Sequence, residues 1–144
     1  MSRSGYSDDC DGWALIRWRG AVKSAIKGKR GQALLRETLA ALDAMPEKKL
    51  VADSLHDPVV GQFCTLGAVG AVRGLDMKPL EDADRDVIAS AFGISEALAA
   101  EIMFENDECY GWRENDTPER RWSRMRAWIE SHLTNPASCL GSQS

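Results

Sequence analysis

The feature that most constrains the fold is a helix-turn-helix pattern in residues 86–108. Two segments of helical composition are separated by a three-residue turn that begins at Gly93. Ala89, four residues before that glycine, provides the small side chain that crossed helices need where they meet. The pattern therefore predicts helices at 86–92 and 96–105 that cross about Ala89 and Gly93.

The second of these helices lacks the residues of a DNA reader. Recognition helices present Arg, Lys, Asn or Gln to the bases, whereas this helix and the residues after it are acidic. The acids are Glu96, Glu101, Glu105, Asp107 and Glu108. Such a surface repels a polyanion, so the pattern predicts a pair of packed helices and not DNA recognition by the second one.

Helical spacing of apolar residues recurs along the chain and predicts a mainly α fold. Four more helices are predicted, at 12–27, 32–45, 66–72 and 118–133. The connection at 28–31 is short, which favours an antiparallel arrangement of the first two helices. We therefore expect a single domain of about six helices.

One small β-hairpin is expected after the second helix. Two apolar runs, 50–52 and 59–66, flank turn-forming residues at 55–58. Gly67 and Gly70 follow, in a segment of helical character, and predict close approach of another part of the chain. A phosphate-binding loop is the rival interpretation, but neither the GK[ST] nor the GxGxxG pattern is present.

The ends of the chain are polar. Residues 1–11 are predicted to be a flexible arm and 134–144 a disordered tail, which leaves 12–133 as the single helical domain. The predicted core consists of Leu15, Trp18, Val22, Leu35, Leu39, Leu42, Phe63, Val69, Val72, Ile88, Phe92, Ile94, Leu98, Ile102, Met125 and Ile129.

Charge is unevenly distributed along the sequence. The net charge is −4, yet residues 1–80 carry 12 Lys and Arg against 9 Asp and Glu. Segment 17–36 holds seven cations and no acid. The cations are Arg17, Arg19, Lys23, Lys27, Lys29, Arg30 and Arg36. With Trp13 and Trp18 for base stacking, this segment could bind nucleic acid. The alternative, favoured by the negative net charge, places Trp18 in the core and the cations toward acidic helices or water.

A second candidate surface is acidic and aromatic. Glu101 and Glu105 share a helical face that could hold a divalent cation, although a solvated face is the more ordinary interpretation. Exposed aromatic residues ringed by polar groups are typical of protein-binding hot spots. The predicted partner-binding residues are Glu101, Glu105, Asp107, Glu108, Tyr110, Trp112 and Glu114.

No catalytic or cofactor-binding motif is present. The four cysteines lack the spacing of a zinc site, and the two histidines lie in no known catalytic pattern. No apolar run reaches the roughly 20 residues of a membrane span, and the N-terminus has no apolar signal core. We therefore expect a cytoplasmic, non-enzymatic protein without metal or cofactor.

Several blocks of the sequence together resemble those of a known group of proteins. They include GYSDDCDGWALIRWRGAV, CTLGAVGAVRGLDM and TPERRWSRMRAWI, and the similarity covers residues 5–133. The chain resembles small, functionally uncharacterised helical proteins encoded in tailed phages and prophages of proteobacteria. The resemblance implies an accessory protein that binds a host or phage protein, with modulation of host defence as one such role. The alternative is a nucleic-acid-binding regulator that uses segment 17–36.

Overall fold

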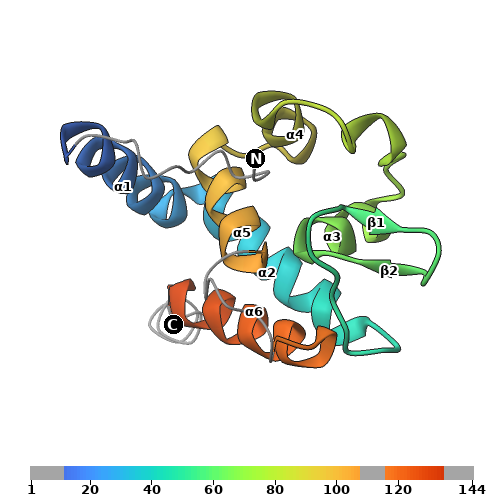
Figure 1. Cartoon of the computed structure of the whole chain (residues 1–144). Coiled ribbons are helices and arrows are strands. Elements are labelled where there is room, and N and C mark those ends of the chain that lie inside the picture. Colours follow the sequence, from blue (N-terminus) through green and yellow to red (C-terminus); the bar gives the residue numbers. More distant parts are fainter. Residues whose placement is uncertain (1–11, 108–115, 135–144) are drawn as a thin grey trace.

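The described part of the chain folds into six α-helices and one two-stranded hairpin (Figure 1). The computed structural model describes residues 12–107 and 116–134, with the backbone alone for 12–16. The helices are α1 (Gly12–Lys27), α2 (Lys29–Ala44), α3 (Thr65–Arg73), α4 (Arg85–Phe92), α5 (Glu96–Asp107) and α6 (Pro118–His132). The predicted mainly α class is confirmed. The predicted arm and tail lie outside the described residues, apart from Thr134.

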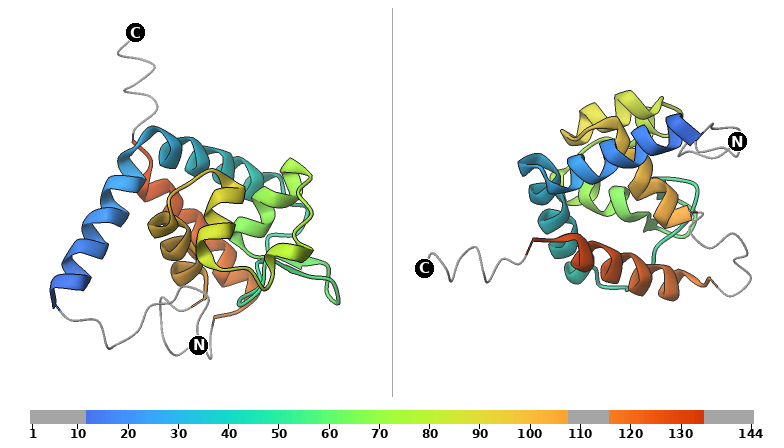
Figure 2. Two further views of the ribbon diagram at one scale, coloured as in Figure 1. Left: turned by 90° about the horizontal axis from the view of Figure 1, so that it is seen from above. Right: turned by 90° about the vertical axis from the view of Figure 1, so that its left-hand side faces the viewer.

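α5 is the central helix of the fold. It packs against α1, α3, α4 and α6 (Figures 1 and 2). Its buried residues are Ala97, Leu98, Ala99, Ala100, Ile102, Met103 and Asn106. A helix that is apolar on several sides must be buried, and its alanines allow neighbouring helices to approach closely. α5 is therefore core rather than an exposed face.

The predicted crossing of α4 and α5 is confirmed. The two helices are bent by 102° at the turn between them. Gly93 adopts a left-handed conformation with φ of 73°, and its N–H donates to the Ser90 carbonyl at 3.1 Å. The N–H of Ile94 donates to the Ala89 carbonyl at 3.0 Å. These two bonds end α4, and the Ser95 hydroxyl caps the start of α5.

The hairpin is present but lies elsewhere than predicted. β1 (His56–Asp57) pairs with β2 (Gln62–Phe63) in an antiparallel register, with His56 opposite Phe63. Each strand has only two residues. Residues 58–61 form the turn, so the predicted turn at 55–58 is wrong.

Local hydrogen bonds explain why the turn of the hairpin lies at residues 58–61 and not at 55–58. The Asp57 carboxylate accepts the N–H of Val59 at 2.9 Å, and the Asp57 carbonyl accepts the N–H of Gly61 at 2.8 Å. Gly61 has φ of 68°, which glycine adopts without strain. The apolar run 50–52 is not a strand, although the N–H of Val51 donates to the Phe63 carbonyl at 3.0 Å.

α1 and α2 form an elbow instead of the predicted antiparallel pair (Figure 2). A Cβ atom added at Gly31 would lie 1.9 Å from the Ala25 carbonyl oxygen, so glycine lets the first turn of α2 rest on the end of α1. The Gln32 amide donates to the Ile26 carbonyl at 2.7 Å and to the His132 carbonyl at 3.0 Å. The elbow is therefore tied to the end of α6.

Most of the predicted core is confirmed. Trp18, Leu39 and Phe63 are half-buried and pack against it, and the Leu15 side chain lies outside the described residues. Val72 is the error, because 65% of its surface is exposed. The first part of α3, residues 65–70, is buried, whereas its last residues before the cap at Gly74 are exposed. The apolar pattern in the sequence therefore continues beyond the residues that contact the core.

The first prediction concerns the close approach at Gly67, which the sequence indicated. A Cβ atom there would lie 1.8 Å from the Leu55 backbone oxygen, so Gly67→Ala should lower the free energy of unfolding by about 1–3 kcal/mol. Gly20→Ala is the control, because no atom lies within 4 Å of the added Cβ and α1 should gain about 1 kcal/mol. Urea unfolding measures both. An unchanged midpoint for Gly67→Ala would contradict the packing described.

Candidate functional site

Six of the predicted cations lie on one exposed stretch of the chain, in α1 and the start of α2. We call it the basic surface: Arg17, Arg19, Lys23, Lys27, Lys29 and Arg30. All six side chains are exposed. Within residues 12–107 and 116–134, none of them forms an ion pair with a carboxylate. The basic surface therefore faces solvent rather than the acidic helices of the same molecule.

The packing of α1 fixes the direction of these cations. Val22 and Ile26 are buried on the side that faces α5. Arg19, Lys23 and Lys27 recur every four residues, so they lie in one row, with steps of about 6 Å along the helix axis. Like charges at this spacing destabilise a helix by about 0.2–0.5 kcal/mol per pair. The fold keeps this repulsion without a neutralising carboxylate among the described residues.

Several arginines elsewhere in the described chain are paired, although Arg36 is exposed and forms no ion pair there. Side-chain hydrogen bonds from Arg73 and Arg126 lower the pKa of the carboxylates that they contact. The pairs are Arg73 with Glu37 at 2.6 Å, Arg126 with Asp43 at 2.6 Å and Arg85 with Glu96 at 3.0 Å. These paired side chains are also partly exposed. They therefore differ from the cations of the basic surface in having a carboxylate partner.

A hollow lies where α1, α2 and the start of α5 meet. Its volume is about 610 Å³, and its lining is mostly small or apolar, including Ala21, Ala25 and Leu98. Lys29 and Arg30 are the charged residues on its lining. The elbow therefore brings two members of the basic surface to the border of a concave site.

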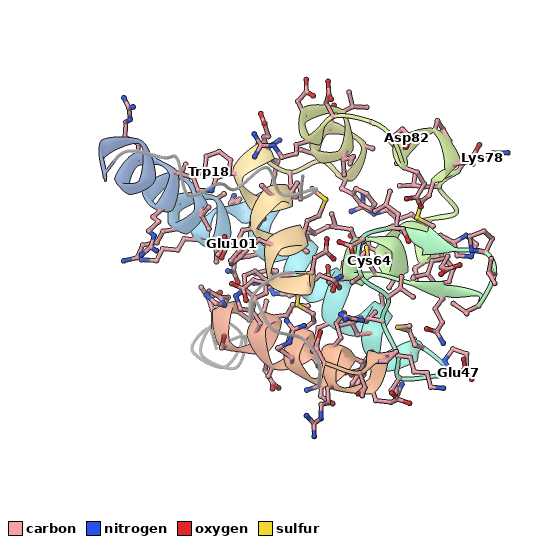
Figure 3. The ribbon with its side chains drawn as sticks, in the orientation of Figure 1. Trp18, Glu47, Cys64, Lys78, Asp82 and Glu101 are labelled. Carbon is pink, nitrogen blue, oxygen red and sulfur yellow. The ribbon has the colours of Figure 1, made fainter. Side chains whose placement is uncertain are left out.

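Trp18 does not serve as the stacking platform that the nucleic-acid hypothesis gave it. Its side chain is half-buried against the core (Figure 3), and the Arg85 guanidinium carbon lies 5.3 Å from its ring centroid. The alternative that placed this indole in the core is confirmed. The side chain of Trp13 lies outside the described residues.

Only part of the predicted acidic and aromatic surface is described. Glu101, Glu105 and Asp107 are partly buried on α5. The Asp107 carboxylate accepts the Asp53 N–H at 3.0 Å and the Asn106 amide at 2.7 Å, so it joins segments of the same molecule. Glu108, Tyr110, Trp112 and Glu114 lie outside the described residues, and their role stays a prediction.

An arginine network at the start of α6 was missed from the sequence. The Asp116 carboxylate contacts Arg121 at 2.8 Å and Arg124 at 2.9 Å, and the three side chains are at most 15% exposed. Arg121 also donates to the Leu50 carbonyl at 2.9 Å, and Arg124 donates to the Glu105 carbonyl. The available signal was an acid just before the helix with arginines five and eight residues later.

Asn106 connects the same region to α3. Its side chain is fully buried, accepts from the Thr65 hydroxyl at 2.8 Å and donates to the Val51 carbonyl at 2.9 Å. Together with the arginine network, it provides hydrogen-bond partners for most of the polar groups where α3, α5 and α6 meet, although the buried Nε of Arg121 has none. These side chains therefore hold the fold together and are not a surface offered to a ligand.

In the described ranges, no group of three or more His, Cys, Asp or Glu residues is placed to hold a metal ion. No single described helix is long and apolar enough to cross a membrane, although the bent pair α4 and α5 passes on length and composition. Searches against family models, curated proteins and solved structures found no match to this chain.

The second prediction tests the arginine network. Asp116→Asn removes the carboxylate from two largely buried guanidinium groups, so it should lower the free energy of unfolding by about 3 kcal/mol. Glu130→Gln is the control, since Glu130 pairs with Arg126 at the surface with 61% of its side chain exposed, and it should change stability by less than about 0.5 kcal/mol. Equal unfolding midpoints for the two variants would show that the network contributes little.

Proposed function

We propose that this chain is a non-enzymatic nucleic-acid-binding protein that contacts phosphates through the basic surface. The observation that supports the proposal is the set of six exposed cations without a carboxylate partner in the described chain. Local positive potential governs phosphate binding more than net charge does. The net charge of −4 therefore does not oppose binding at this face.

The distribution of charge along the chain also favours one end of the protein for contact with nucleic acid. Residues 81–144 carry 13 Asp and Glu against 6 Lys and Arg, so this half of the sequence is net negative and repels phosphates. Between residues 17 and 30 the chain has no Asn or Gln, the side chains that pair with adenine, and its lysines and arginines are also the ordinary contacts of phosphates. We expect binding that depends weakly on sequence and strongly on salt.

The interpretation as a phage or prophage accessory protein that binds a host or phage protein stays a prediction. It depends largely on Glu108, Tyr110, Trp112 and Glu114, which lie outside the described residues. A cytoplasmic setting in a host cell is compatible with either partner. The basic surface is the site for which the described structure offers more support.

The third prediction tests the proposal by salt dependence. In a fluorescence anisotropy titration with short labelled DNA, log affinity should fall linearly with log salt, by about 0.9 per phosphate contacted on duplex DNA. Replacing Lys23 and Lys27 together by Gln should reduce that slope by about two and weaken binding at every salt concentration.

The matched control is Lys78→Gln, which removes an exposed lysine from the far side of the chain (Figure 3). It should leave both the affinity and the slope nearly unchanged. The proposal fails if the unmodified protein binds no nucleic acid at low salt. It also fails if Lys23 and Lys27 contribute no more than Lys78.

A further inference from the structure

Within the part of the chain that the structure describes, α1 is covered on one side only and extends past the other helices (Figures 1 and 2). Val22 and Ile26 face the core, while Gly20 and Ser24 are exposed, with Ser24 at the border of the hollow beside α5. A helix with its side chains is about 10–12 Å across, and the major groove of B-form DNA is about 12 Å wide. The uncovered side of α1 therefore has the dimensions of a groove-binding helix.

The exposed ridge of α1 is unusually small. Gly20 lies inside the helix, where glycine is among the least favourable residues. A Cβ atom added there would meet no atom within 4 Å, so packing in the described chain does not require this glycine. Gly20 and Ser24 are one helical turn apart and together leave a low ridge that lets the helix axis approach a ligand closely.

Cations lie on both sides of that ridge. Helical geometry places Arg19, Lys23 and Lys27 on one side and Arg17 on the other. Two strands of phosphates border a duplex groove, so a helix lying in the groove meets negative charge on both of its flanks. A single strand would engage only one flank at a time.

Other forms of nucleic acid fit this helix less well. Single-strand binders stack bases on aromatic side chains, but Trp18, the one aromatic residue among the described side chains of α1, is packed against the core near Arg85. The major groove of duplex RNA is too deep and narrow for side chains to read. We infer that the basic surface binds double-stranded DNA, with α1 lying along the major groove. This inference rests on the proposed function and names its ligand.

The first test compares the affinity of the unmodified protein for duplex DNA, single-stranded DNA and duplex RNA of one sequence at one low salt concentration. Duplex DNA should bind more tightly than either of the others, on the order of tenfold. The comparison needs no variant, so the inference stays testable whatever a substitution does to folding.

The second test adds bulk to the ridge. Gly20→Leu places a side chain in open space, so the unfolding midpoint should not fall, whereas affinity for duplex DNA should drop on the order of tenfold through a clash in the groove. Ala127→Leu adds the same bulk to an exposed position on α6 and should leave affinity unchanged.

The outcomes separate the two proposals. Equal affinity for the three nucleic acids, or a Gly20→Leu protein that folds and binds duplex DNA normally, overturns the groove-binding inference and leaves phosphate binding in place. No binding of any of the three at low salt overturns both. Preference for duplex DNA together with selective loss in Gly20→Leu supports both.

Discussion

The fold depends on burying α5, and that burial requires its polar end to be satisfied. Asn106 is fully buried, and a buried amide without partners costs about 1–3 kcal/mol. Its bonds to Thr65 and Val51 remove that cost and position α3 and the segment before the hairpin. The Arg124 guanidinium donates hydrogen bonds to the backbone carbonyls of Glu105 and Asn106 at the end of α5. The start of α6 is thereby placed beside α5.

This arrangement divides the charges of the protein into two groups. Near α5 and α6, acids and arginines pair with each other, as Asp116 does with Arg121. On α1 the cations have neighbours of the same sign and no described carboxylate partner. Internal pairing explains the first group. The second group forms no ion pair within the described residues, and this is the observation behind the proposed contact with phosphates.

The helices could be predicted from local patterns, but several contacts could not. Gly93 ends α4 in a left-handed conformation that glycine adopts without strain, so the end of this helix could be predicted from the sequence. The approach of Ala25 to Gly31 depends on how two helices meet, so the elbow was missed. Arg121 reaches Leu50, 71 residues away, and no short-range pattern encodes that pair. The acids of α5 suggested that this helix has an exposed face. Its burial instead follows from the alanines and aliphatic residues between those acids.

The helix-turn-helix pattern acts here as a packing device. In DNA readers the second helix must be exposed so that its side chains reach the bases. α5 occupies that position, but α1, α3, α4 and α6 pack around it. Ala99 and Ala100 have no exposed surface, so groove entry by α5 would require dismantling the core. α1 has the opposite properties, because only one side is packed and its cations remain exposed. Of these two helices, α1 is therefore the one whose described side chains are placed for the DNA contact that we propose.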